Sequence, residues 1–429
     1  MIELFANSGL FTNYSVKSLL FDFIFYYPFF MSYLWMSGAI FYYTRFERHF
    51  VNLSAPPELE TYPGVALVIP CHNEEDNVTE TVTQLFKQNY PDFEIIAIND
   101  GSTDRTQEIL ANLAKQDKRL RVIHQVKNQG KASGLNMAAL LTDKEYLFCI
   151  DGDCLLDENA VAWMMQHFNN SPRVGAVTGN PRIRNRSSLL GKIQVGEFSS
   201  IIGLIKRSQR VYGRIFTVSG VIAAFRKAAL HDIGYWSTEM LTDDIDVSWK
   251  MQLAHWDIRF EPKALCWILM PETLSGLWKQ RLRWAMGGVQ TAMKYAPILM
   301  AWKKRRMLMV FFEFLTSMIW SYFIAAVIFL SLISMVLPMP AFLYMPPLTP
   351  GWNGVVLGFT CMLQISVSMY LDSKYDRGLW KIYFWMIWYP LIYWMLNVLT
   401  MVVAVPKTLM RNNKQHATWV SPDRGLKKL

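Results

Sequence analysis

Hydrophobic residues are distributed unevenly along this chain and divide it into two kinds of region. Long apolar runs occur near the beginning and in the last third, at residues 19–44, 307–337, 355–371 and 379–405. About 20 apolar residues cross the hydrocarbon core of a bilayer, so each run is long enough, or nearly so, to be a membrane helix. Residues 62–306 contain no such run and are numerous enough to form a water-soluble domain with its own core.

A second pattern fills the first half of this middle region, where short β-branched apolar runs alternate with segments of helical periodicity. The predicted strands and helices follow one another at 65–70, 73–89, 93–100, 104–116, 121–126, 130–142 and 145–150. This alternation indicates a Rossmann-like α/β domain with a parallel sheet and crossover helices. Ligands of such sheets bind outside the carboxyl ends of the strands. We therefore expect the polar residues at those ends to converge on one edge, namely Asn73, Glu74, Asp100, Asp151 and Asp153.

Composition agrees with an integral membrane protein that carries a large soluble domain. The chain has 429 residues, of which 52% are hydrophobic and 18% charged, and its formal net charge is +9. Basic residues such as KKRR at 303–306 flank the middle region, whereas the loop at 338–351 has no charge, so the soluble domain is expected in the cytoplasm. The five cysteines form no CxxC pair, which fits a reducing compartment.

The two ends of the chain raise separate questions of topology. The first apolar run has no small-residue cleavage site, so we interpret it as an uncleaved anchor. The tail at 406–429 carries six cations and one acid, which favours the cytoplasm. Three single crossings after residue 306 would leave this tail on the other side. The run at 379–405 contains Pro390 and can therefore be a kinked span or a re-entrant pair, so the sequence leaves the parity open.

The most informative acids are Asp151 and Asp153, which follow a predicted strand with one glycine between them. Two carboxylates so close repel each other, and a divalent cation relieves the repulsion. Oxygen ligands of this kind suit Mg²⁺ or Mn²⁺ on a substrate diphosphate, although an acidic turn is the simpler alternative. Lys131, at a predicted helix start, fits either a diphosphate contact or a solvated lysine.

Two further segments combine chemistry with an ordinary structural explanation. Asp243 and Asp244 open a predicted helix after Thr242, where a capping residue and first-turn acids are typical. An ionised acid is also what deprotonation of a sugar hydroxyl requires, and Asp244 is the candidate. In the helix predicted around 277–289, Gln280, Arg283 and Trp284 share one arc, while Lys279 and Arg281 are interpreted as flanking charges of a helix that lies on a membrane.

The segment 182–214 holds eight cations and a single acid, Glu197. A solvated basic face is the generic interpretation of such a run. Nucleic acid is not expected as a partner, because the domain is tethered to a membrane and has no recognisable nucleic-acid-binding motif.

Four of these features occur in a fixed order: Asp100 in DGS, the Asp151/Asp153 pair, Asp244 in TDD, and Q-x-x-R-W at 280–284. The ordered set resembles the processive family 2 glycosyltransferases, which are the membrane synthases of cellulose, chitin, hyaluronan and poly-N-acetylglucosamine. Within that family the resemblance is greatest to bacterial synthases of poly-β-1,6-N-acetylglucosamine. It rests on the stretches PCHNEE, VGAVTGNPRIR, VGEFSSIIGLIKRSQRVYG, FTVSGVIAAFRK, CWILMPETLSGLWKQRLRWAMGG and WVSPDRG.

The resemblance implies a GT-A fold inserted between transmembrane helices and assigns a role to each candidate residue. It places the donor UDP-sugar against Pro70, Asn73, Glu74, Asp100, Lys131, Asp151, Ser219 and Gly220. The metal would be bound by Asp153 and Asp151, and the transfer would involve Asp244 as base, with Asp243, Gln280, Arg283 and Trp284. The usual Thr-Glu-Asp motif reads Thr-Asp-Asp here, and the shorter side chain puts a contact by residue 243 in doubt.

The activity implied is an inverting, metal-dependent polymerisation of N-acetylglucosamine from UDP-N-acetylglucosamine for a biofilm exopolysaccharide. The location implied is a bacterial inner membrane, with the lipid bilayer, a small membrane subunit and export machinery as partners. Alternatives are another processive synthase, transfer of one sugar to a lipid carrier, or a non-enzymatic scaffold or transporter. The expected division is an anchor, a glycosyltransferase domain, interfacial helices, membrane segments and a tail, at 1–48, 49–270, 271–306, 307–405 and 406–429.

Overall fold

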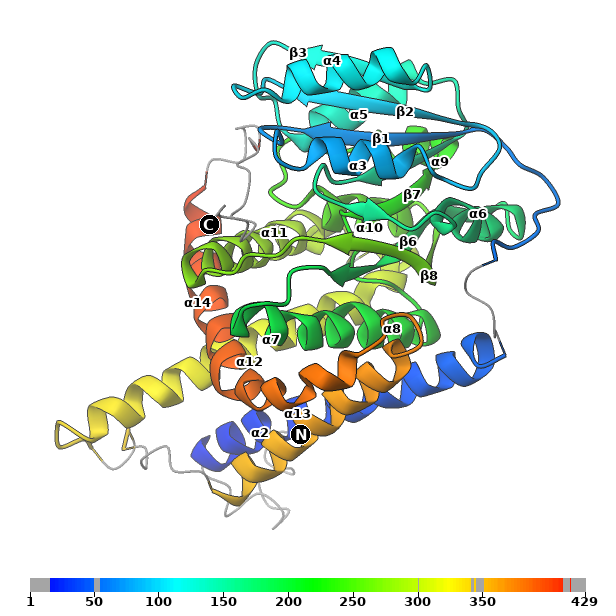
Figure 1. Ribbon diagram of the computed structural model, residues 1–429. Coiled ribbons are helices and arrows are strands. Elements are labelled where there is room, and N and C mark those ends of the chain that lie inside the picture. Colours follow the sequence, from blue (N-terminus) through cyan, green and yellow to red (C-terminus); the bar gives the residue numbers. More distant parts are fainter. Residues whose placement is uncertain are drawn as a thin grey trace.

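The computed structural model describes residues 16–49, 55–299, 301–340, 343–344, 351–411 and 417. The start of the expected anchor, most of the uncharged loop and the WVSPDRG stretch of the tail lie outside the described residues. Figure 1 shows an α/β unit at the top, a layer of helices beneath it and long helices at the bottom.

The α/β unit is built on an eight-stranded sheet with the strand order β3-β2-β1-β4-β7-β6-β8-β5. The strands are β1 Val65–Cys71, β2 Phe93–Asp100, β3 Leu120–Gln125, β4 Tyr146–Ile150, β5 Leu155–Leu156, β6 Val174–Ile183, β7 Ile222–Arg226 and β8 Asp257–Ile268. The predicted parallel pairing is confirmed for β1 to β4. The prediction covered only these strands. Beyond β4 the sheet is mixed, with β7 antiparallel to both β4 and β6, and β6 parallel to β8. Between β6 and β7 the chain leaves the sheet to form helices at the membrane side, and it returns in the opposite direction.

Helices cover both faces of the sheet. One core cluster joins the sheet to α3 Val78–Leu85, α4 Thr106–Gln116 and α6 Ala160–Asn169. The other joins it to α5 Lys131–Leu141, α9 Lys227–Asp232 and α10 Asp243–Leu253. Val78, Val82 and Leu85 are fully buried, as their helical spacing predicts. Helix α3 is shorter than the predicted 73–89. Asn73 lies outside it, with a left-handed backbone (φ 55°) that α-helical residues do not adopt.

A layer of helices separates the sheet from the long helices below it (Figure 1). It contains α7 Leu189–Phe198, a π-helical segment Ser199–Ile205 and α8 Lys206–Tyr212. Helix α11, Leu274–Leu299, runs alongside and carries the Q-x-x-R-W residues in its first half. These elements place the candidate site close to the apolar part of the molecule.

Within the described residues, three helices are long and apolar enough to cross a membrane, at Lys17–Glu47, Lys303–Ser334 and Trp352–Asp372. They contain α2 Val16–Tyr42 with a π-helical turn Tyr43–Glu47, α12 Leu308–Ser334 after a 3-10 turn Trp302–Met307, and α13 Trp352–Asp372. At the end of this bundle that is far from the sheet, Lys17 Nζ donates to Tyr344 O at 2.9 Å. The start of α2 therefore lies beside the loop that joins α12 to α13.

The last apolar run is not one straight helix. It consists of a 3-10 segment Leu379–Trp388, a π-helical turn Tyr389–Tyr393 and α14 Trp394–Met410. Pro390, which lacks a backbone N–H, lies at the break. Beyond α14, Arg411 Nη1 donates to Gln290 Oε1 (3.4 Å) and Ala417 N donates to Thr238 O (3.0 Å). The described part of the tail therefore lies against the soluble domain.

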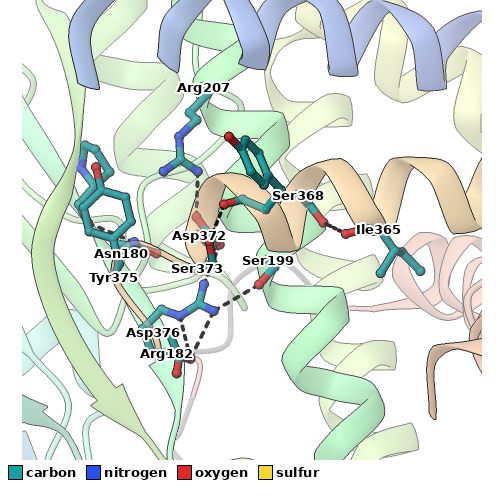
Figure 2. Close-up of polar contacts among 12 residues, drawn as sticks. Asn180, Arg182, Ser199, Arg207, Ile365, Ser368, Asp372, Ser373, Tyr375 and Asp376 are labelled. Atoms are coloured by element: carbon teal, nitrogen blue, oxygen red, sulfur yellow. Dashed lines mark hydrogen bonds and ion pairs between the residues drawn. The ribbon is translucent and has the colours of Figure 1, made fainter. Parts of the chain in front are cut away.

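A buried ion network joins the soluble domain to the ends of two long helices, and Figure 2 shows its part at the end of α13. Asp372, at the end of α13, accepts from Arg182 of β6 at 2.5 Å and from Arg207 of α8 at 2.8 Å. Arg207 also donates to Glu47, at the end of the first long helix, at 2.7 Å. A Cβ on Gly203 would collide with the Asp372 carboxylate, so the π-helical segment needs glycine here.

This network corrects the expectation of a solvated basic face at 182–214. Arg182, Lys206 and Arg207 are at most 3% exposed. A buried charge without a charged partner is unfavourable, because ions lose their hydration on burial. The carboxylates that compensate the two arginines come from segments more than a hundred residues away in the chain, so no local pattern announces them.

Candidate active site

The loops that follow β1, β2 and β4 meet at one edge of the sheet, as the sequence predicts. Asn73 Oδ1 accepts the backbone N–H of Thr103 at 2.9 Å, which joins the loop after β1 to the loop after β2. Glu74 lies directly beneath Gly152, where a Cβ would be 3.1 Å from Glu74 Cγ. Thr81 Oγ1 donates to Gly152 O at 2.9 Å and ties the acid turn to α3.

Asp100 organises the segment that precedes Lys131. Its two carboxylate oxygens accept the backbone N–H groups of Gln129 (2.7 Å) and Gly130 (2.8 Å). Gly130 has a φ of 87°, which favours glycine. The immediate role of Asp100 in this structure is therefore to shape the start of α5. Pro70, also a predicted donor contact, is buried near the end of β1.

Lys131 is not a solvated lysine. Its ammonium pairs with Asp151 and donates to Gly220 O at 2.8 Å, and only 17% of its side chain is exposed. Burial alone would lower the pKa of Lys131, but the carboxylates of Asp151, Asp243 and Asp244 outweigh it and raise the pKa. Lys131 is thus the cation shared by the acid pair and the α10 acids.

The acid pair has the donor set of a divalent-cation site. Burial raises the pKa of Asp153 to about 7, and the nearby Asp151 carboxylate adds to this shift. A cation at this position would favour the ionised form of both carboxylates. No group of three His, Cys, Asp or Glu side chains that could hold a metal occurs within the described ranges. The two carboxylates fit a hard cation that takes its other ligands from substrate oxygens and water.

Asp244 lies in the first turn of α10 and faces the same space. A Cβ on Gly220 would be 3.3 Å from its Oδ2, so the Ser219–Gly220 turn contacts the carboxylate closely. Burial raises the pKa of Asp244 to about 6, with a further contribution from Asp243. Thr242 is the residue before the helix, as predicted, but its side chain makes no capping hydrogen bond.

Helix α11 brings the Q-x-x-R-W residues to the start of α10. A Cβ on Gly287 would overlap the Thr242 side chain, so glycine permits the two helices to approach this closely. Arg283 is exposed, and its Nη1 donates to Leu241 O at 3.4 Å, beside the α10 acids. Gln280 and Trp284 are partly buried on the same helix.

The interpretation of Arg281 as a flanking charge is wrong. Arg281 is 4% exposed, and its Nη2 lies 2.5 Å from Glu197 Oε2 of α7. Its guanidinium also lies over the Trp284 ring, 4.3 Å from the ring centroid. Arg281 and Arg283 lie within one turn of α11 and differ only in the direction they face. Arg281 is the buried one because α7 packs against its side of the helix. Lys206, buried next to Ser219, was missed for the same reason.

The arrangement combines an acid pair, a buried lysine and a partly buried acid on one edge of an α/β sheet. These groups can bind an anionic phosphate group and accept a proton from a hydroxyl. Disposed around one space at strand ends, they suit transfer from a nucleotide-activated substrate to an alcohol.

Comparison with known proteins agrees with this chemistry. The sequence profile described as "Glycosyl transferase family 2" matches residues 66–234. The poly-β-1,6-N-acetyl-D-glucosamine synthase of Staphylococcus epidermidis is 40% identical over 407 residues, which is 94% of this chain and 98% of the relative. The synthase of the same name from Staphylococcus aureus is 38% identical over 406 residues, with 94% and 98% coverage.

A solved structure shares the overall fold at much lower sequence identity. The mannosyltransferase PcManGT from Pyrobaculum calidifontis superimposes with a TM-score of 0.57 and 17% identity, covering 91% of this chain and 99% of the other. The sheet, the flanking helices and the long apolar helices are thus those of a GT-A glycosyltransferase associated with a membrane. The chain is an enzyme of glycosyl transferase family 2, and it belongs to the branch of that family that contains these synthases.

Proposed function

We propose that this glycosyltransferase polymerises N-acetylglucosamine from UDP-N-acetylglucosamine into a β-1,6-linked chain for a biofilm exopolysaccharide. The observation that carries the proposal is the position of Asp244 beside Lys131 and the Asp151/Asp153 pair at one sheet edge. The relatives that match nearly the whole length are named for this product, and they motivate the choice of sugar and linkage.

On the donor side, the loops after β1 and β2 would hold the uridine through Pro70, Asn73 and Asp100. Lys131 would meet the diphosphate, because its ammonium lies next to Asp151 at the end of β4. Asp153 and Asp151 would hold Mg²⁺ or Mn²⁺, which when bound supplies positive charge that stabilises the leaving diphosphate. The remaining donor contacts in this proposal come from Glu74, Ser219 and Gly220.

On the acceptor side, Asp244 would remove the proton from the hydroxyl of the growing chain. The hydroxyl oxygen would bond to the anomeric carbon as the bond to the UDP oxygen breaks, which inverts the anomeric configuration. A base with a pKa near 6 is largely ionised at neutral pH and can perform this step. Gln280, Arg283 and Trp284, all on α11, would shape the acceptor end, with Asp243 tuning the charge of Asp244.

We also propose that the soluble domain faces the cytoplasm of a bacterial inner membrane and that α2, α12 and α13 each cross it once. Glu47 and Asp372, at the ends of α2's segment and α13, both contact the soluble domain. The span Lys303–Ser334 begins with basic residues, and Lys304 Nζ donates to Leu253 O of the soluble domain at 2.7 Å, as expected for a cytoplasmic flank. A small membrane subunit and export machinery are the proposed partners beyond the bilayer, the donor and the polymer.

The donor and the chemistry are tested together by incubating the purified full-length chain with a panel of UDP-sugars and Mg²⁺ or Mn²⁺. We expect UDP release with UDP-N-acetylglucosamine, and a loss of about 1,000-fold or more in Asp244→Asn, because the amide cannot accept the proton. Lys279→Gln, an exposed change on α11, is the matched control and should retain activity. Undiminished turnover in Asp244→Asn would refute the role of this residue.

A further inference from the structure

Lys206 is a buried cation that the proposed reaction does not use directly. Only 3% of the residue is exposed, and its Nζ donates to Ser219 Oγ (2.6 Å) and Thr178 Oγ1 (3.2 Å). Among the described residues, no carboxylate forms an ion pair with it. Its partners are two neutral hydroxyls, one of which belongs to the turn next to the candidate base.

Burial of such a lysine is energetically unfavourable, because an ammonium loses its hydration when it is buried. Burial lowers the pKa of Lys206 to about 7, and the charge of Asp244 opposes the shift. Lys206 therefore lies within electrostatic reach of the candidate base. A neutral hydrogen-bond donor could link β6 to the Ser219 turn equally well. The presence of a buried amine therefore suggests that Lys206 has a role besides this structural link.

The turn at Ser219–Gly220 is held from several directions. Lys131 binds Gly220 O at 2.8 Å, on the donor side. On the base side, Ser248 Oγ accepts the backbone N–H of Val218 (2.8 Å) and donates to Asp244 O (2.6 Å). From the side of β6, Thr178 Oγ1 accepts the backbone N–H of Ser219 at 2.8 Å, and Lys206 donates to both hydroxyls. The turn thus contacts both Lys131, at the acid pair, and the α10 turn that carries the candidate base.

The helix that carries Lys206 is itself anchored. The next residue, Arg207, binds Glu47 at 2.7 Å and Asp372 at 2.8 Å, and the second of these contacts is visible in Figure 2. Glu47 and Asp372 terminate two of the long apolar helices. Consecutive residues of α8 therefore have different partners: Arg207 binds the ends of the membrane helices, and Lys206 binds the turn at the active site.

We propose that Lys206 is a positioning residue for glycosyl transfer, which acts through Ser219 to hold the Ser219–Gly220 turn between Lys131 and Asp244. Arg207 fixes the helix from which Lys206 reaches the turn. The role of Lys206 rests on the proposed function in one respect, namely that Asp244 is the base in a glycosyl transfer. It requires no particular sugar, since it concerns the geometry of the base relative to the donor.

A double-mutant cycle with Lys206→Met, Ser219→Ala and the combined variant tests this proposal. Methionine has a similar length and no charge, and apolar replacement of a buried charge is usually tolerated. The full-length chain is assayed with whichever UDP-sugar the wild type accepts, so that a wrong donor assignment is detected separately. Lys263→Met is the matched control, because Lys263 is also buried, on β8, with its Nζ 3.8 Å from the centroid of the Trp163 ring.

We expect each single change to lower kcat about 10- to 100-fold, as small misplacements of reacting groups do. In Lys206→Met the KM for the donor should change by less than about threefold, because the loops that bind the nucleotide remain intact. Ser219→Ala should also raise this KM, because Ser219 is itself a proposed donor contact. The double variant should be no slower than the slower single variant, since both changes remove one interaction. Lys263→Met should keep the kcat of the wild type.

Three results would overturn the proposal: a wild-type kcat in Lys206→Met, losses that multiply in the double variant, or an equal loss in Lys263→Met. Thermal unfolding in detergent identifies variants that lose activity by unfolding. If Lys206→Met does not accumulate in membranes, Ser219→Ala decides alone, because it removes only one hydroxyl. A wild-type kcat in that variant would show that the Lys206–Ser219 contact has no part in transfer.

Discussion

At the scale of single residues, the ionisation of Asp244 is set by its surroundings. Burial and the adjacent Asp243 raise its pKa to about 6, whereas Lys131 and Arg283 act in the opposite direction. The acid is therefore ionised at neutral pH yet basic enough to accept a proton from a hydroxyl. The cations that limit the shift come from α5 and α11, so the pKa of the proposed base depends on helices that are distant in the sequence.

This balance predicts the pH dependence of the enzyme. Because the base must be ionised, kcat/KM should fall as the pH decreases through about 6. Asp243→Asn removes a neighbouring negative charge and should move this acid limb to lower pH. The measurement is a pH profile of kcat/KM at saturating metal, so that Asp153 does not limit the rate. An acid limb that stays in place, or moves to higher pH, would contradict the coupling.

The sequence predicted which residues would meet at the sheet edge, because residues that follow parallel strands share an edge. It did not predict the burial of Arg281 or Lys206. Both are cations on helices, and the partners that compensate or contact them, Glu197 and Ser219, are separated from them by 84 and 13 residues. Only the packing of α7, α8 and α11 decides which cations are buried.

At the scale of elements, buried ion pairs connect the ends of the long helices to β6 and α8. Arg182 and Arg207 share Asp372, and Arg182 also binds Asp376 at 3.2 Å. Removing one partner of a buried pair leaves an uncompensated charge, which costs more than the pair itself contributes. The network thus makes the orientation of the catalytic domain on the membrane helices specific.

Asp372→Asn should therefore destabilise the protein by about 3 to 5 kcal/mol, since two arginines lose a charged partner. The matched control is Asp92→Asn, which breaks a surface pair with Lys144 and should cost about 1 kcal/mol or less. Thermal unfolding of the full-length chain in detergent compares the two. Equal effects of the two substitutions would show that the buried network has no special importance.

The direction of β7 and the division of the last apolar run depend on long-range packing, which local sequence patterns do not predict. The parallel half of the sheet followed from alternation of strands and helices, but the antiparallel β7 did not, because its direction depends on the excursion through α7 and α8. The apolar run at 379–405 predicted a membrane segment, yet its division into a 3-10 segment, a π-helical turn and α14 depends on packing against α7 and α11.

At the scale of the whole molecule, three apolar helices and a broken fourth segment are consistent with a tail on the catalytic side. Ala417 contacts Thr238 of the soluble domain, whereas Tyr344 contacts Lys17 at the far ends of the long helices. If the run at 379–410 enters the membrane and returns to the side of the soluble domain, the basic tail lies on the cytoplasmic side, as the positive-inside rule predicts. The parity that the sequence left open then has a physical solution.

Cysteine labelling tests this topology. All five native cysteines are buried, so the wild-type chain should react slowly with a membrane-impermeant maleimide. In spheroplasts we expect Tyr344→Cys to be labelled from outside, and Ala417→Cys to be labelled only after permeabilisation. Labelling of both variants from the same side would exclude the proposed arrangement.

The most direct test of the proposed function is the structure of the product itself. The purified full-length chain in lipid nanodiscs is supplied with UDP-N-acetylglucosamine and Mg²⁺, and the product is examined by mass spectrometry and methylation linkage analysis. The account predicts a polymer of N-acetylglucosamine joined through O6, and no polymer from Asp244→Asn. A product limited to one sugar on a lipid, or a polymer with another linkage, would contradict it.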